Sequence, residues 1–90
     1  MTKVLVTAQV EDGAQWEEGF RTHGELFKSM TMTSCHYAVM DNHVAVYAEV
    51  DDQAKYFEVM DSDATAEAMA HDGIKRDTVK VFVLDKEFNL

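Results

Sequence analysis

The order of apolar and polar positions divides this chain into short strands and amphipathic helices. Residues 3–10 form a short, β-branched and almost continuously apolar run, which predicts a strand covered on both faces. The next apolar positions follow the spacing i, i+4, i+7, i+11 and i+14, which places side chains on one face of a helix: Trp16, Phe20, His23, Phe27 and Met30. Because Asp12 and Gln15 have the spacing of a capping box, we expect one helix over residues 13–30.

Residues 35–40 and 43–50 read as two strands joined by Asp41 and Asn42. Both turn residues tolerate a positive φ, so the pattern predicts a tight antiparallel hairpin. Its register puts three pairs on one face: Met40 with His43, Ala38 with Ala45, and His36 with Tyr47. Three further pairs share the opposite face: Val39 with Val44, Tyr37 with Val46, and Cys35 with Ala48.

The second helical region follows the hairpin and is interrupted. Asp51 or Asp52 can cap a helix over residues 53–60. Residues 61–63, Asp-Ser-Asp, are poor inside a helix and good as caps, so we expect a break there and a further helix over residues 64–70.

Gly73 ends this helical region as a left-handed residue, with Ile74 folding back as its apolar companion. Residues 78–84 then form the last strand, and residues 85–90 a short tail. The element order is βαββαβ, and we expect residues 1–90 to form a single domain. This is an α+β, ferredoxin-like fold with a four-stranded antiparallel sheet and two helices on one face.

The sheet face opposite the helices is also apolar. The residues that fall on it are Leu5, Ala38, Met40, Ala45, Tyr47, Phe82 and Leu84, with His36 beside them. Left in water they would form a large apolar patch, so we expect a second copy of the chain to cover this face. His36 and His43 share the face with Tyr47 and Glu49 and would form a hydrogen-bond network between the two copies. Their spacing matches no metal-binding motif, and no metal is expected.

Composition narrows the set of partners. Seventeen acidic residues against eight basic ones give a formal charge of −9, which repels phosphate backbones and anionic membranes, so neither nucleic acid nor a membrane is expected as a partner. The lone Cys35 excludes an internal disulfide, and its apolar surroundings predict a packed, unreactive thiol. The sequence has no signal-peptide pattern and no run of about 20 apolar residues, so we expect a cytoplasmic protein.

Three stretches of the sequence resemble the dimeric α/β-barrel superfamily. They are the W-x3-F-x2-H pattern at Trp16, Phe20 and His23, the strand-to-helix passage over residues 46–57, and the re-capped helix over residues 60–69. Within that superfamily the chain is most similar to small stand-alone domains related to the antibiotic-biosynthesis monooxygenases. The resemblance implies a homodimer in which two sheets pack into a barrel, with a pocket between the sheet and the helices of each copy.

The enzymes of this group include oxygenases that need no metal or cofactor, small-ring isomerases and haem-degrading monooxygenases. The haem-degrading members use an Asn on the first strand with a Trp and a His on the second helix. Here the first strand has no Asn and the second helical region no Trp, although His71 lies near its end. We therefore reject haem degradation, and we expect no cofactor.

His23 is the polar member of the apolar line and the main candidate for chemistry. Between helix and sheet its imidazole could serve as a general base, with Tyr37 assisting, or could orient a polar group of a ligand. A core histidine bonded to a backbone carbonyl or to Tyr37 is the alternative. The side chains expected to line a ligand pocket are Trp16, Phe20, His23, Phe27, Tyr37 and Phe57.

Three functions remain open at this stage. The first is binding of a small, mainly apolar molecule in this pocket. The second is a cofactor-independent oxygenase or isomerase that acts on a cyclic or polyketide-like substrate, with His23 as the base. The third is a dimerisation module without a cavity. Its only functional surface is the sheet face opposite the helices, called here the bare sheet face.

Overall fold

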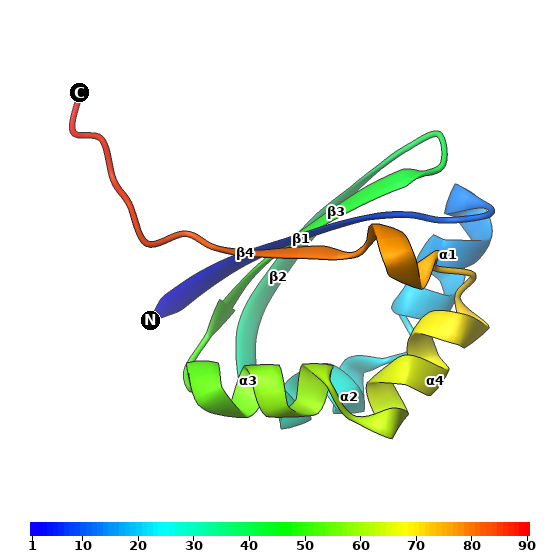
Figure 1. Ribbon diagram of the computed structural model, residues 1–90, viewed down its shortest axis with the longest axis horizontal. Coiled ribbons are helices and arrows are strands. Elements are labelled where there is room, and N and C mark those ends of the chain that lie inside the picture. Colours follow the sequence, from blue (N-terminus) through cyan, green and yellow to red (C-terminus); the bar gives the residue numbers. More distant parts are fainter.

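The computed structural model describes residues 1–90. In chain order its elements are β1 (Thr2–Gln9), α1 (Gly13–Phe20), α2 (Gly24–Ser29), β2 (Met32–Met40), β3 (His43–Val50), α3 (Gln53–Met60), α4 (Asp63–His71), a short 3-10 turn (Arg76–Thr78) and β4 (Lys80–Val83). The strands form one antiparallel sheet in the order β2-β3-β1-β4, and both helical regions cover the same face (Figure 1). The predicted α+β, ferredoxin-like fold is confirmed.

The β2–β3 hairpin has the predicted register. Its pairs include Met40 with His43, Tyr37 with Val46 and Cys35 with Ala48. Asp41 adopts a φ of 56°, the left-handed conformation that the tight turn requires. The alternation of side chains along both strands therefore places one set toward the helices and the other away from them.

The expectation of one helix over residues 13–30 is wrong, because the chain breaks between α1 and α2. The N–H groups of Thr22 and His23 bond to carbonyls three residues earlier, and the Thr22 hydroxyl bonds to the Gly19 carbonyl oxygen at 2.6 Å. These tighter turns end α1, and Gly19, Thr22 and Gly24 are all weak helix formers. His23 precedes α2 with φ −97° and ψ 26°, and its side chain makes no capping bond. It therefore lies in a joint between two helices and not inside one.

The break in the second helical region is confirmed. Ser62 is the N-cap of α4, and its hydroxyl accepts a hydrogen bond from the Thr65 N–H. At the other end Gly73 has a φ of 74°, with its N–H bonded to the Ala70 carbonyl. Ile74 donates to the Met69 carbonyl, so the two bonds form a Schellman motif. The last strand is shorter than the expected residues 78–84, since Thr78 belongs to the 3-10 turn.

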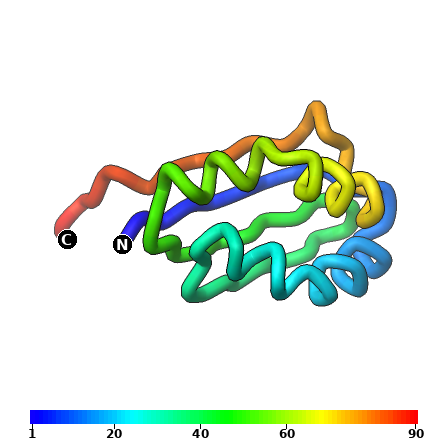
Figure 2. The backbone as a smooth tube through the Cα atoms, turned by 90° about the horizontal axis from the view of Figure 1, so that it is seen from below, coloured from blue at the N-terminus to red at the C-terminus, as the bar shows by residue number.

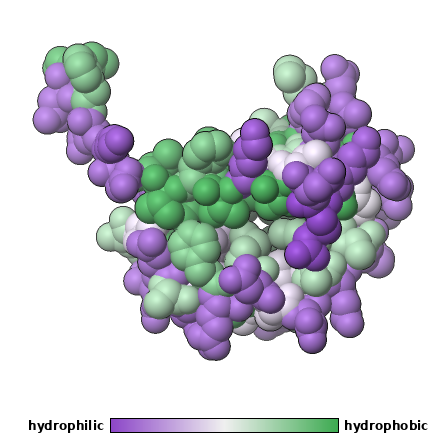
Figure 3. Space-filling view, in the orientation of Figure 1, coloured by the Kyte–Doolittle hydropathy of each residue, from purple (hydrophilic) through white to green (hydrophobic).

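The two faces of the sheet have different surroundings. The two helical regions run side by side over one face (Figure 2) and bury a core made by Val4, Ala8, Val10, Trp16, Met30, Val44, Ala48, Val50 and Tyr56. On the other face Met40, Phe82 and Leu84 remain 70%, 47% and 45% exposed. Figure 3 shows a band of hydrophobic residues along the sheet, while hydrophilic and hydrophobic residues are mixed over the helical layer. None of the helices is long and apolar enough to cross a membrane.

Candidate functional site

An apolar cavity of about 90 Å³ lies between the sheet and the helices. Of the 20 residues that line it, 17 are hydrophobic, so it resembles a ligand pocket in composition. Strands β1 and β3 supply Val6, Ala8, Val44, Val46 and Ala48, and the helical layer supplies chiefly Trp16, Phe20, Leu26, Phe27, Met30, Tyr56, Met60, Ala68 and Met69. A cavity of roughly 150 Å³ holds benzene, so this one suits a small occupant unless its walls move.

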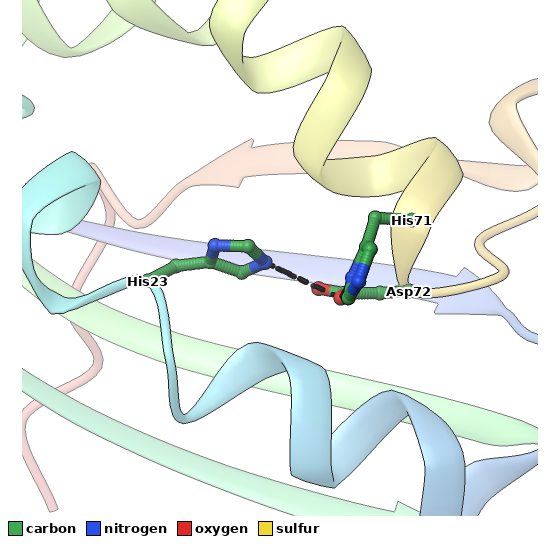
Figure 4. Close-up of side chains that lie close together, drawn as sticks. All are labelled: His23, His71 and Asp72. Atoms are coloured by element: carbon green, nitrogen blue, oxygen red, sulfur yellow. Dashed lines mark hydrogen bonds and ion pairs between the residues drawn. The ribbon is translucent and has the colours of Figure 1, made fainter.

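The polar side chains of the cavity wall include His23 and Asp72, which contact each other. His23 Nε2 lies 3.0 Å from Asp72 Oδ2 and 3.2 Å from Oδ1 (Figure 4). Asp72 is only 4% exposed and carries its carboxylate among apolar neighbours. His71, on the solvent side, places Nδ1 3.1 Å from Asp72 Oδ1. One buried carboxylate thus holds two imidazoles, one in the cavity wall and one at the surface.

Backbone structure at two distant points brings His23 and Asp72 together. Asp72 is the C-cap residue of α4, where the turn at Gly73 fixes its backbone. Gly19 in α1 makes room for the carboxylate, since a Cβ there would collide with Asp72 Oδ1. His23 reaches the same point because it lies in the joint between α1 and α2. The bond from His23 to a backbone carbonyl or to Tyr37, which was the alternative to a role in the pocket, is not the one formed: Nε2 contacts the Asp72 carboxylate.

Asp72 is the functional candidate that sequence reasoning missed. It is 49 residues from His23 along the chain, and no local pattern links the two. The signal that existed was its place directly before Gly73, which marks the end of a helix. That position indicated that Asp72 lies at a helix end, but it did not indicate which side chain Asp72 contacts.

Trp16, which lines the cavity, carries an unsatisfied donor. Its side chain is 1% exposed and stacks on Phe20, with ring centroids 4.6 Å apart. The indole Nε1 is buried and has no hydrogen-bond partner. A buried donor left unpaired costs about 1–3 kcal/mol, so a partner from an occupant would be favourable.

Four of the six side chains expected to line the pocket do so: Trp16, Phe20, His23 and Phe27. Tyr37 lies behind that wall, with its ring 5.1 Å from Phe20 and its hydroxyl donating to Glu17 Oε2 at 2.6 Å. The hydrogen bond to Glu17 is the main cause of the raised pKa of the Tyr37 hydroxyl, and desolvation adds to it. Phe57 also lies outside the lining and packs against Tyr56, at a centroid distance of 5.4 Å.

The remaining reactive side chains lie away from the cavity. The expectation of a packed Cys35 is wrong, because the residue is exposed at the edge strand β2. Partial burial still raises the pKa of its thiol, which favours the protonated and unreactive form. His36 and His43 are exposed on the bare face, with the His36 ring 6.3 Å from that of Tyr47.

Comparison with solved structures places this architecture among known proteins. The chain matches no family model and no curated protein sequence. A protein from Bordetella bronchiseptica, provisionally assigned as an antibiotic biosynthesis monooxygenase, is similar with a TM-score of 0.76 and 11% identity over 97% of each chain.

SnoaB from Streptomyces nogalater, a cofactor-independent oxygenase, has a TM-score of 0.73 and 12% identity, with 99% of this chain and 95% of SnoaB covered. A dimeric ferredoxin-like protein from an uncultured marine organism has a TM-score of 0.58 and 10% identity over 99% of this chain and 91% of its own. At such identities the likeness concerns the fold and transfers no activity. The chain has the ferredoxin-like fold of antibiotic biosynthesis monooxygenase-like proteins.

Proposed function

We propose that this protein binds a small, mainly apolar molecule in the cavity between its sheet and its helices. The observation that carries the proposal is the composition of the wall, which is apolar except for a few polar side chains, among them the paired His23 and Asp72. Ligand sites commonly combine apolar walls with a few polar groups that orient the occupant. Four methionines in the wall, Met30, Met32, Met60 and Met69, have flexible side chains and allow the cavity to widen.

The polar groups of the wall favour an occupant that carries an oxygen atom. The Trp16 indole N–H lacks an acceptor, which a carbonyl, hydroxyl or phenolate oxygen would supply. His23 uses Nε2 to contact Asp72, while its Nδ1 has no partner in the protein. A phenol-like molecule fits this wall, because its ring matches the apolar side chains and its oxygen can accept a hydrogen bond from the Trp16 indole N–H.

Calorimetric titration with p-cresol and toluene tests this proposal, since the two molecules differ by one hydroxyl group. We expect saturable binding of one p-cresol per chain and weaker binding of toluene. Ala68→Met fills the cavity from α4 and should weaken both ligands at least tenfold, whereas Ala70→Met, on the exposed side of the same helix, should not. The absence of saturable binding, or equal effects of the two substitutions, would contradict the proposal.

The function also includes formation of a homodimer through the bare sheet face. Exposed apolar side chains at Met40, Phe82 and Leu84 support this assignment, because water-exposed patches of this kind mark interaction surfaces. The dimeric ferredoxin-like protein described above has the same fold, which adds support. The remaining residues assigned to the interface are Leu5, His36, Ala38, Ala45 and Tyr47.

Sedimentation at several protein concentrations measures this association. Phe82→Asp places a charge among the exposed apolar side chains of the face and should yield folded monomers. Ala54→Asp, on the exposed surface of α3, is the matched control and should leave the dimer intact. A parent protein that stays monomeric at high concentration would exclude the dimer.

A second candidate function is cofactor-independent oxygenation, and the His23–Asp72 pair is the observation that favours it. With Nε2–H held by the carboxylate, His23 Nδ1 can accept the proton of a phenolic hydroxyl. The electron-rich phenolate would then be oxidised by dioxygen to a quinone. One oxygen atom forms a C=O bond at a ring carbon ortho or para to the hydroxyl, and the other leaves as water with the hydrogen of that carbon and the hydroxyl proton. Tyr37 takes no part in this scheme, because its hydroxyl is engaged by Glu17 outside the cavity.

Enzyme assays with a bound phenol distinguish this function from simple binding. His23→Ala should abolish oxygen consumption while the ligand affinity changes little, and His43→Ala on the bare face should keep full turnover. Normal turnover by His23→Ala would rule out the base mechanism. A ligand that binds without any oxygen consumption would leave binding as the function.

A further inference from the structure

The polar end of the cavity has the composition of a metal site. His23, His71 and Asp72 each offer one ligand atom, and these three atoms lie within 4.8 Å of one another (Figure 4). We propose that they bind a divalent cation of the zinc type, with His23 Nε2, His71 Nδ1 and an Asp72 oxygen as the ligands. This site goes beyond the proposed function and does not depend on what occupies the cavity. It also differs from the expectation of no metal drawn from the sequence.

The charge on Asp72 supports a bound cation. The carboxylate is 4% exposed, and its only ion-pair or hydrogen-bond partners are the two imidazoles, with no Lys or Arg among them. It also lies at the C-terminal end of α4, where the helix carbonyls already concentrate partial negative charge. A buried carboxylate in such a position is unfavourable unless positive charge compensates it. A divalent cation between the carboxylate and the imidazoles would provide that charge.

The geometry needs only a small adjustment. Two nitrogen ligands about 2.1 Å from a tetrahedral zinc ion lie about 3.4 Å apart, so ligand atoms within 4.8 Å have to close slightly. The His71 side chain is 72% exposed and is free to rotate toward His23. Asp72 is already in place, because the Gly73 turn and the space left by Gly19 fix its carboxylate.

The donor set favours zinc-type cations over calcium and magnesium. Imidazole nitrogens suit zinc, cobalt, nickel and copper, whereas calcium and magnesium prefer sites made of oxygen ligands alone. Three protein ligands leave a fourth position open, as in catalytic zinc sites. Because His23 and Asp72 also line the cavity, an open position on that side would be reached by a molecule in the cavity.

Calorimetric titration of tag-free protein with zinc chloride tests the site directly. We expect one zinc ion per chain, at least a tenfold loss of affinity in His71→Ala, and no change in His43→Ala. The size of that loss is a lower bound, since even a residue that only orients a metal ligand contributes 10–100-fold. His71 is exposed, so its replacement should leave the fold intact, and His43 is an exposed histidine on the opposite sheet face.

Cobalt chloride provides a second readout, because its visible absorption reports the number and type of ligands. A tetrahedral cobalt spectrum in the parent protein that disappears in His71→Ala would support the site. Absence of saturable zinc binding, or equal loss in His71→Ala and His43→Ala, would overturn it. Binding of p-cresol in the absence of metal is measured separately, so failure of the metal site and failure of the ligand site are distinguishable.

Discussion

The two faces of the sheet are built from the same alternating strands but end in different surroundings. Toward the helices Val4 and Val50 are fully buried, and a cavity with a polar end lies between this face and the helices. On the opposite face Met40 and Phe82 remain in water. Apolar alternation therefore predicts which side chains share a face of the sheet. It does not predict whether helices of the same chain cover that face.

Paired truncation of one aromatic side chain on each face should give the largest difference. Trp16→Ala removes a fully buried ring and should lower the free energy of unfolding by about 3–5 kcal/mol. Phe82→Ala should cost less than about 1 kcal/mol at low protein concentration, because its ring is 47% exposed. Urea unfolding of both variants measures the effect. Similar losses would mean that the bare face is packed as firmly as the covered one.

Alkaline unfolding reports on Tyr56, which lies on α3 and packs in the core over the covered face. Burial raises the pKa of its hydroxyl from 10 to about 12, with a smaller contribution from Cys35. Between these pH values the unfolded chain has lost a proton that the folded chain retains, so stability is full below pH 10 and falls as the pH rises toward 12. The loss should be about 3 kcal/mol, from about 1.4 kcal/mol per pKa unit.

The control for this alkaline transition is Tyr56→Phe, which has no ionisable hydroxyl group. Chemical unfolding at a series of pH values should show a shallower decline for the variant. An identical decline in both proteins would show that other groups cause the alkaline loss.

Two glycines test how tightly the helical layer is fitted. Gly19→Ala adds a methyl group against the Asp72 carboxylate and should cost about 1–3 kcal/mol while weakening zinc binding. Gly24→Ala is the same change at the start of α2, where nothing lies within 4 Å of the added carbon, and it should stabilise the fold by about 0.5 kcal/mol. Thermal unfolding of the two variants measures the expected loss of stability in Gly19→Ala and the expected gain in Gly24→Ala. Equal effects would contradict the close approach at Gly19.

The smallest expected effect concerns a helix cap. Ser62→Ala removes the side-chain acceptor for the Thr65 N–H and should lower the free energy of unfolding by about 1 kcal/mol. Ser62→Asp retains an acceptor at the same position and should behave like the parent protein. If both substitutions lower the free energy of unfolding equally, the hydrogen bond to the Thr65 N–H does not contribute to stability.

The two helix breaks illustrate what the sequence could predict. The break before α4 was predictable because Ser62 and its acidic neighbours are strong cap signals. The break before α2 was not, since the apolar spacing through His23 continues across it and no side chain caps the second helix. The stripe itself survives the break, with Phe20 and Phe27 at a centroid distance of 4.8 Å. Hydrophobic periodicity therefore identified the buried line correctly and overestimated its regularity.

The candidate site was predictable to the same partial degree. Trp16, Phe20 and Phe27 follow from the helical spacing, and they line the cavity. Tyr37 was placed correctly on the helix-facing side of its strand, but the hydrogen bond to Glu17 depends on tertiary geometry. Asp72 required knowledge of where the end of α4 meets the joint before α2. Contacts of that kind depend on how whole elements pack, which single-residue patterns do not encode.

The central position of β1 has a consequence for how the chain folds. This strand pairs with β3 on one side and with β4 on the other, so Val4 contacts both Ala48 and Val83 across the sheet. Such pairings join segments far apart in the sequence, and they form more slowly than local contacts because the intervening chain must first be closed into a loop. Until β4 arrives, β1 exposes an open edge with unpaired backbone groups, which can pair with another chain. Pairing with β4 therefore protects this edge of β1 from other chains in the folded protein.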